Sequence, residues 1–346
     1  MKKEKIIVVI PYHNSFISND TKILSDYYEV VLNNYNWKRK ELYPIYVFLQ
    51  FFSLLLNIRK TSKILVQFGG YWSVIPTLLG KLFNIPVAIV LHGTDTAIIH
   101  HLNYGSMRKK LVKSVCEFSY KRTRILLPVS PSLIYTENQY VSQENKQGIK
   151  YYFPDLNTQF KVIPNGLNIN FWTRLNEINK EDNRFLAVFS ESQFLIKGGD
   201  LIVQIAEKFP TYEFYIAGCD NLDSYNSPNN VHFLGRLSKN ELLKEYNKAQ
   251  YYFQLSIFEG FGLSLCEAML CECIPIVSSV NILPEIIGDS GFILTRKDIV
   301  LLEKIINNVT SITNKISLGK KASARIIDNY SMQNRANLLI DTLNQL

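Results

Sequence analysis

The chain runs through one pattern twice: short apolar segments alternate with longer segments of helical periodicity, in residues 1–161 and again after residue 183. The predicted strands of the first half are 6–11, 28–32, 64–68, 87–92 and 125–130, and its predicted helices are 41–59, 74–83 and 105–122. Unbroken Val, Ile and Leu runs separated by helices are typical of a parallel sheet that is covered on both faces.

The second half repeats the alternation. Its predicted strands are 184–190, 213–217, 231–234, 251–255 and 274–277, and its predicted helices are 199–208, 238–248, 262–270 and 298–308. We therefore expect an α/β protein of two doubly wound domains, 1–170 and 171–330, followed by a helix in 331–346 that crosses back to the first domain. Ligands of such sheets bind beyond the carboxyl ends of the strands.

The loop after the predicted strand 251–255 contains the residues best suited to bind a ligand. Gly260 and Gly262 permit close approach to the backbone, and the free N–H groups at the start of the next helix favour a phosphate. Glu259 and Glu267 offer carboxylates, which accept hydrogen bonds from sugar hydroxyls. From the residues alone, a solvated loop glutamate and a helix-surface glutamate are an equally good interpretation.

The spacing of these two glutamates resembles a known signature. The stretch Glu259-Gly-Phe-Gly-Leu-Ser-Leu-Cys-Glu267 is similar to that of glycosyltransferase family 4, and the likeness continues through 275–279, 283–287 and 291–294. The family has the GT-B fold, in which two Rossmann-like domains face each other across a cleft. This resemblance implies that domain 1–170 binds the acceptor and that domain 171–330 binds the nucleotide-sugar donor. Its members use nucleotide sugars and retain the configuration of the anomeric carbon.

The resemblance implies a role for each matching residue. Glu259 would contact the hydroxyls of the donor sugar, and Glu267 would contact the ribose. The backbone at Gly260, Phe261, Gly262 and Leu263 would approach the diphosphate. Lys197 matches the family lysine that neutralises the diphosphate, in agreement with its place at a predicted strand-to-helix turn. By itself, such a lysine is more often a solvated surface charge.

Two further positions bear on this site. The family usually has an arginine five residues before the lysine, where this chain has Ser192. In the first half, Leu91-His-Gly-Thr-Asp95 resembles the family's histidine loop, which implies that His92 donates a hydrogen bond to a donor-sugar hydroxyl. Without the resemblance, a structural histidine is the better interpretation of His92, and Asp95 fits the cap of a following helix.

These features together define the expected reaction. No Asp-x-Asp motif follows a predicted strand, so we expect no metal ion, and Lys197 with helix N-termini would stabilise the leaving diphosphate. No cofactor is expected, because the nucleoside-diphosphate sugar is the donor substrate. The expected function is hexosyl transfer to a glycan or lipid-linked acceptor in surface polysaccharide biosynthesis.

The charge of the chain is uneven. Residues 1–170 carry 21 Lys and Arg against 10 Asp and Glu, whereas 171–346 carry 17 against 20. Basic residues also flank the apolar segment 44–58, which is shorter than the ~20 residues of a membrane-spanning helix. A helix buried in the first domain is the favoured interpretation of 44–58, and a peripheral contact with an anionic membrane is the alternative. Five cysteines without a paired framework indicate a cytoplasmic protein, peripheral on the inner face of the cell membrane in that alternative.

Three other functions compete with this expectation. An oxidoreductase needs a Gly-x-Gly-x-x-Gly turn after its first strand, and this chain has Ile-Pro-Tyr-His from residue 10. A nucleic-acid-binding protein would use the basic half, but no recognised motif accompanies the charge, so nucleic acid is not an expected partner. The alternative functions are a GT-B protein that isomerises or phosphorolyses a sugar and a basic nucleic-acid-binding protein.

Overall fold

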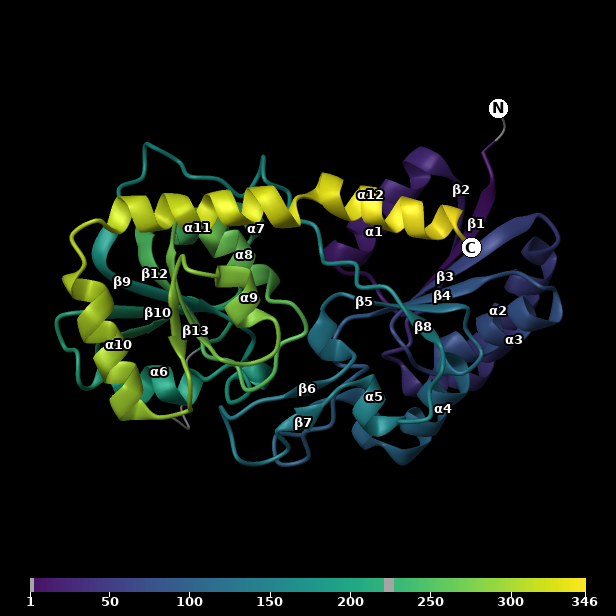
Figure 1. Cartoon of the computed structure of the whole chain (residues 1–346), viewed down its shortest axis with the longest axis horizontal. Helices are drawn as coiled ribbons and strands as arrows, with labels where there is room; N and C mark the ends of the chain where they lie inside the picture. Colours follow the sequence, from purple (N-terminus) through teal and green to yellow (C-terminus); the bar gives the residue numbers. More distant parts are fainter. Residues whose placement is uncertain (1–2, 221–226) are drawn as a thin grey trace. The chain divides into compact units, whose positions relative to one another are not determined.

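The computed structural model describes residues 3–220 and 227–346 (Figure 1). It divides into two compact units, each with its own parallel sheet. The first unit comprises Met1–Thr136, Lys146–Gly166 and Gln333–Leu346, and the second comprises Glu137–Asn145 and Leu167–Met332. The end of the chain therefore packs with its beginning.

The first unit is built on six parallel strands in the order β2-β1-β3-β4-β5-β8. Their bounds are β1 Lys5–Ile10, β2 Glu29–Asn34, β3 Thr61–Gln67, β4 Val87–Leu91, β5 Ile125–Pro128 and β8 Gln159–Phe160. All five residues of β4 are buried, as are Ile6–Ile10 of β1. Runs of Val, Ile and Leu occur here because both faces of the sheet are covered.

Helices lie on both faces of this sheet. They are α1 Ser15–Tyr27, α2 Tyr43–Ile58, α3 Val74–Leu82, α4 Lys110–Tyr120, α5 Ile149–Tyr152 and α12 Met332–Asn344. The Arg335 guanidinium of α12 forms a bidentate ion pair with Asp20 of α1, with Nε–Oδ1 at 2.6 Å and Nη2–Oδ2 at 2.7 Å. Arg335 also donates to the carbonyls of Ile163 and Pro164. These bonds attach α12 to the first unit.

The second unit has six parallel strands in the order β11-β10-β9-β12-β13-β14. The strands are β9 Glu181–Val188, β10 Glu213–Ala217, β11 Val231–Phe233, β12 Ala249–Gln254, β13 Ile274–Ser278 and β14 Phe292–Leu294. The helices are α6 Gly199–Ala206, α7 Lys239–Lys248, α8 Leu263–Leu270, α9 Leu283–Ile287, α10 Ile299–Ser311 and α11 Lys315–Tyr330. Stacked rings of Phe185, Tyr251 and Phe253 fill the centre of this core.

The favoured interpretation of residues 44–58 as a buried helix is wrong. The segment forms α2, but only Gln50, Leu54 and Ile58 of this helix are buried. Phe48 is 62% exposed and Leu56 is 84% exposed. The reason is geometric: one stripe of α2 is enough to cover the sheet, and the remaining apolar residues face outward. By length and composition alone, Lys40–Ile58 is also long and apolar enough to cross a membrane.

We predict that Arg335→Met lowers the free energy of unfolding by about 3–5 kcal/mol, because it leaves the Asp20 carboxylate buried without a partner. Urea denaturation measures this change. Combining it with Asp20→Asn should restore part of the loss, because the uncompensated charge is then removed as well. Lys304→Met, which removes an exposed cation, is the control, and a denaturation midpoint for Arg335→Met equal to that of the control would contradict the prediction.

Candidate active site

The order of the strands in the second sheet reverses next to β9. Chain connections run from β9 to β10 on one side and from β12 to β13 on the other, and the loops on either side of such a reversal are where doubly wound sheets bind ligands. Lys197 lies in the loop after β9, and Glu259 lies in the loop after β12. The Ile257 N–H donates to the Ile196 carbonyl at 2.8 Å, which holds the two loops together.

Lys197 and Glu259 form an ion pair with Nζ and Oε2 2.5 Å apart. The side chains are only 15% and 11% exposed, so the two charges are poorly hydrated and each needs the other. Gln254 Nε2 and Ser256 Oγ also donate to Oε2, at 2.8 Å and 3.2 Å. These bonds hold the Glu259 carboxylate in one orientation, and among the described residues no hydrogen-bond donor contacts its other oxygen, Oε1.

Two glycines shape the backbone around this pair. Gly198 has a φ of +76° and directly precedes α6, and Gly262 has a φ of +100° and directly precedes α8. A Cβ on Gly198 would come within 2.5 Å of the Leu255 carbonyl oxygen. Glycine is therefore required where the two loops approach. The N–H groups at the start of each following helix lack partners within it and favour an anion.

The remaining predicted residues of this loop have distinct environments. Gly260 and Gly262 are buried, and Leu263 is the first residue of α8. The Phe261 ring is buried against Tyr330, with centroids 5.4 Å apart, so only its backbone is free to approach a ligand. The Tyr246 hydroxyl donates to Glu267 Oε2 at 3.3 Å. The surrounding protein replaces water and raises the pKa of Glu267 to about 7.

Three side chains that hold Glu259 were missed from the sequence: Gln254, Ser256 and Asn281, whose Oδ1 accepts from the Glu259 N–H at 3.0 Å. A signal existed for one of them, since Gln254 is a polar residue at the carboxyl end of β12, where ligands of such sheets bind. Ser192, where the family usually has an arginine, lies in a short 3-10 helix, Glu191–Gln193, with its hydroxyl 3.2 Å from that of Ser190.

His92 lies in the first unit, directly after β4. Its ring packs against Phe68 and Phe16, with centroid distances of 4.3 Å and 4.6 Å. Burial lowers the pKa of His92 to about 3, with the Arg335 charge adding to the effect, so the imidazole is neutral. A neutral imidazole has one donor nitrogen and one acceptor nitrogen.

Hydrogen bonding assigns these two nitrogens. Gln67 Nε2 donates to the Asp20 carboxylate at 2.8 Å, which turns Gln67 Oε1 towards His92 Nε2 at 2.7 Å. Nε2 therefore carries the proton and donates to Gln67. The other nitrogen, Nδ1, is buried without a partner among the described residues and is an acceptor. The resemblance implied a donor at this position, and this tautomer differs because Gln67 occupies the N–H.

Asp95 does not cap a helix, since the segment that follows it consists of turns. Its carboxylate accepts from the backbone N–H groups of Gly69, His92 and Gly93, each at 3.0 Å. Desolvation outweighs these bonds and raises the pKa of Asp95 to about 6. Asp95 thus joins the loops that follow β3 and β4 and fixes the backbone of His92.

The structure also locates the cysteines and the side chains that could hold a metal ion. All five cysteines are buried and form no disulfide, so they pack as small apolar residues of the core. Among residues 3–220 and 227–346, no group of three or more His, Cys, Asp and Glu side chains is arranged to hold a metal ion.

The second unit is similar in sequence to known glycosyltransferases. Residues 170–329, slightly less than half of the chain, match the family model described as glycosyl transferases group 1. A stretch of 69 residues, 20% of the chain, is 35% identical to O-antigen chain mannosyltransferase B of Escherichia coli and spans 18% of that protein. A longer match, 23% identical over 72% of the chain, spans 64% of an uncharacterized glycosyltransferase of Methanocaldococcus jannaschii.

The fold has solved counterparts. Sucrose-phosphate synthase of Thermosynechococcus elongatus superimposes with a TM-score of 0.78 at 14% identity, over 99% of each chain. The Anabaena protein HepE, solved in complex with UDP-glucose, superimposes with a TM-score of 0.72 at 15% identity, over 99% of this chain and 100% of HepE. The protein therefore has the GT-B fold, and its second unit carries the sequence pattern of glycosyl transferases group 1.

Proposed function

We propose that the protein transfers a hexose from a nucleoside-diphosphate sugar to a hydroxyl of a glycan or lipid-linked acceptor, with retention at the anomeric carbon, as in family 4. The observation that carries this proposal is the Lys197–Glu259 pair beside the start of α8. It places a cation, a fixed carboxylate and helix N–H groups at the strand-order reversal, where a sugar diphosphate needs all three.

Each group has a role in the proposed reaction. Lys197 and the backbone N–H groups of residues 261–263 bind the diphosphate and stabilise the charge that develops as the anomeric C–O bond breaks. Glu259 accepts hydrogen bonds from the transferred sugar through its free oxygen. Glu267 accepts hydrogen bonds from the ribose. His92 contacts the transferred sugar, with Nδ1 as an acceptor for a hydroxyl hydrogen.

The chemical step needs no nucleophilic side chain. The acceptor oxygen attacks from the face that the diphosphate leaves, and the departing phosphate oxygen takes the acceptor proton. Lys197 and the helix N-termini supply the positive charge, so we propose that no metal ion takes part. The setting proposed is surface polysaccharide synthesis, which is supported by the likeness to an O-antigen mannosyltransferase and by a structural neighbour solved with UDP-glucose.

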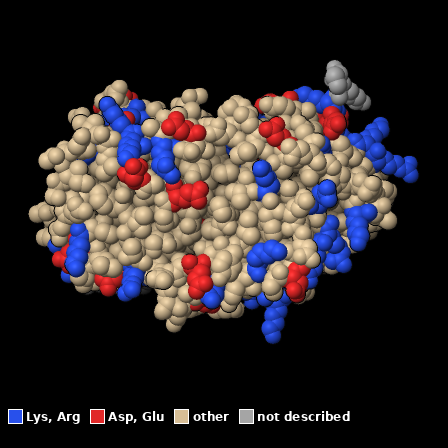
Figure 2. Space-filling view, in the orientation of Figure 1, with Lys and Arg blue, Asp and Glu red and all other residues tan. Residues whose placement is uncertain are grey.

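We further propose that the enzyme works at the cytoplasmic face of a membrane, with α2 lying on the surface. The apolar outer face of α2 is continued by Leu78, Leu82 and Phe83 at α3, which are also exposed. Lys38, Arg39 and Lys40 precede α2, and Arg59 and Lys60 follow it. Figure 2 shows Lys and Arg side chains gathered over the first unit with few acidic ones between them. This charge complements an anionic lipid surface.

The relative sizes of the apolar and electrostatic contributions indicate how α2 contacts the membrane. Burying one large apolar side chain contributes about 1.5–3 kcal/mol, whereas each Lys or Arg near an anionic surface contributes about 1 kcal/mol. The apolar face therefore supplies most of the affinity, and the basic residues select the lipid. Gln50 of α2 donates to Asn33 and to the Trp72 carbonyl, which keeps the opposite stripe attached to the unit. The helix accordingly lies on the surface and does not cross it.

We predict that Lys197→Ala and Glu259→Gln each lower kcat about 100-fold, because each removes a contact to developing charge or to the reacting sugar. Product analysis with a panel of nucleotide sugars measures this and separates transfer from isomerisation and phosphorolysis. Lys208→Ala, which breaks an exposed ion pair with Glu303, is the matched control. Turnover in both site variants equal to that of the control would refute the assignment.

A second prediction concerns pH. The folded-state pKa of Glu267, about 7, lies above its unfolded value, so its contribution to the free energy of unfolding is full below about pH 4.5 and is lost as the pH rises through 7. The free energy of unfolding of the wild type should therefore fall by up to about 3 kcal/mol between pH 5 and 8, and Glu267→Gln should remove this fall. Asp95 also has a raised pKa and contributes to the pH dependence of both proteins. Subtracting the free energy of unfolding of the variant from that of the wild type removes this contribution and leaves that of Glu267.

The affinity for the nucleotide should change with pH in the opposite direction to the free energy of unfolding. The affinity for UDP is expected to rise between pH 6 and 8, because ionised Glu267 accepts both ribose hydroxyl hydrogens. Calorimetry on wild type and Glu267→Gln checks this. A nucleotide affinity that is independent of pH in the wild type would exclude Glu267 from the ribose site.

The membrane contact is tested by vesicle sedimentation. Phe48→Ser combined with Leu56→Ser should weaken binding to phosphatidylglycerol vesicles by about tenfold or more, since two large apolar contacts are lost. Ile316→Ser, an exposed apolar residue of α11, is the control. Two results would overturn the proposal. One is equal binding of the wild type to phosphatidylcholine and phosphatidylglycerol vesicles. The other is a wild-type protein that binds no vesicles but forms a dimer, which the double variant dissociates.

A further inference from the structure

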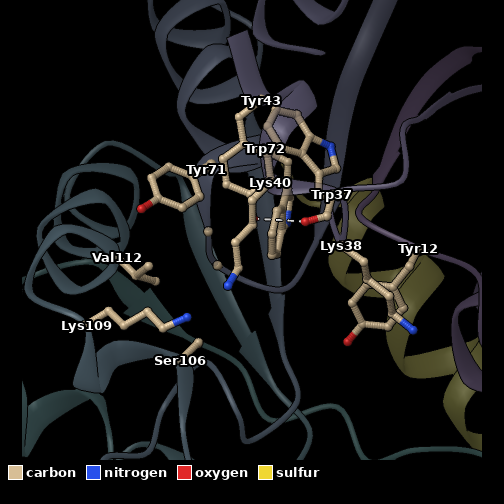
Figure 3. Close-up of a pocket in the computed structure, with 12 residues that line it drawn as sticks. Tyr12, Trp37, Lys38, Lys40, Tyr43, Tyr71, Trp72, Ser106, Lys109 and Val112 are labelled. Carbon is tan, nitrogen blue, oxygen red and sulfur yellow. Dashed lines mark hydrogen bonds between the residues drawn. The ribbon is translucent and has the colours of Figure 1, made fainter. Parts of the chain in front are cut away.

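The first sheet also reverses its strand order, between β1 and β3. The loops after these strands enclose a cavity of about 300 Å³ (Figure 3). Tyr12 follows β1, and Gly69, Gly70 and Trp72 follow β3. The proposed donor site does not use this cavity, although its position is the one where doubly wound sheets bind ligands.

Aromatic side chains form the walls of the cavity, and hydrogen bonds hold them in place. The Trp72 indole N–H donates to the carbonyls of Gln67 and Phe68, at 2.9 Å and 3.0 Å. The Tyr43 hydroxyl donates to the Trp37 carbonyl at 2.9 Å. Rigid aromatic walls with a few polar groups are typical of small-molecule sites. Flat apolar rings of this kind suit the C–H face of a sugar.

The backbone of the cavity leaves no room for side chains on its glycine positions. A Cβ on Gly70 would come within 2.5 Å of the Trp72 ring, and one on Gly69 would come within 1.9 Å of the Tyr120 hydroxyl oxygen. The Gly69 N–H is fixed by Asp95. The shape of the cavity is therefore set by close packing on its inner side.

Three lysines line the same cavity: Lys38, Lys40 and Lys109. Among the described residues none of them forms an ion pair with a carboxylate, although Lys38 lies over the Tyr12 ring. Figure 3 shows the ammonium groups of Lys40 and Lys109 pointing toward the same space. The charge of Lys40 lowers the pKa of Lys109, which reports like charges at close range. An anion bound between them would remove this repulsion.

The position of the cavity next to α2 indicates which kind of molecule carries such an anion. Tyr43, which lines the cavity, is the first residue of α2, and Lys40 belongs to the short 3-10 helix Lys40–Leu42 just before it. The cavity thus borders the helix that has the exposed apolar face. A lipid with its chain beside α2 would present its head group to the three lysines and the aromatic walls.

We propose that this cavity binds the phosphate-bearing sugar head of a lipid-linked acceptor, with Lys40 and Lys109 on the phosphate and Trp72 and Tyr71 against the sugar. The proposal rests on the glycosyltransferase function proposed above and specifies its acceptor class. It differs from binding of a neutral glycan, for which unpaired lysines serve no purpose. It also differs from a free-phosphate site, for which the aromatic walls serve no purpose.

The test uses the full chain and three probes: farnesyl diphosphate-linked glucose, octyl glucoside and inorganic pyrophosphate. The indole N–H signals of Trp37 and Trp72, followed by NMR, report occupancy of the cavity independently of activity. We expect the diphosphate-linked glucose to shift both signals and to bind at least about tenfold more tightly than either other probe, because it alone makes both kinds of contact.

The variant Lys40→Gln with Lys109→Gln should weaken binding of this probe by about tenfold or more, with UDP affinity unchanged. Lys110→Gln is the matched control, because Lys110 is the exposed neighbour of Lys109 and does not line the cavity. Equal binding of the probe by the double variant and the control, or equal binding of octyl glucoside and the diphosphate-linked glucose, would overturn the proposal.

A separate measurement of UDP binding distinguishes failure of the acceptor proposal from failure of the glycosyltransferase proposal. If UDP binds and Lys197→Ala abolishes that binding while the lipid-linked probe fails to shift either indole, only the acceptor proposal is wrong. If no nucleotide binds to the wild type, the glycosyltransferase function itself is wrong.

Discussion

The reversal of strand order in each parallel sheet is the constraint on which both proposed ligand sites depend. In a doubly wound sheet, the connections leave the two central strands in opposite directions, and ligands bind beyond the carboxyl ends of the strands at that point. The reversal lies between β9 and β12 in the second unit and between β1 and β3 in the first. Lys197 and Glu259 lie at one reversal, and the aromatic cavity with its three lysines lies at the other.

Charges in the protein are arranged according to their access to water. Asp20 and Arg335 are fully enclosed, and they are paired twice over, because an unpaired charge there would be very costly. Lys197 and Glu259 are nearly enclosed and also paired, so a ligand diphosphate must offer Lys197 a better partner than Glu259 does. Lys40 and Lys109 are at the mouth of a cavity, where water makes unpaired cations tolerable until an anion binds.

The network behind His92 connects parts of the chain that are remote in sequence. Arg335 binds Asp20, Asp20 accepts from Gln67, and Gln67 accepts from His92. Each bond determines the orientation of the next group, and the last one determines which imidazole nitrogen carries the proton. The chain's last helix therefore sets the hydrogen-bonding character of a residue in its first hundred.

The sequence by itself determined the two sheets, most of their strands and the loop with Glu259, because unbroken apolar runs, helical periodicity and the spacing of glycines and glutamates are local properties. The strand Glu213–Ala217 matches its predicted range, whereas α1, whose apolar pattern is diluted by polar residues, was not assigned. Only the tertiary structure decided that Gln254, Ser256 and Asn281 orient Glu259, that His92 offers an acceptor and that α2 turns its apolar face outward. These depend on which residues meet across the fold, and no periodicity along the chain records which side of a helix its neighbours leave uncovered.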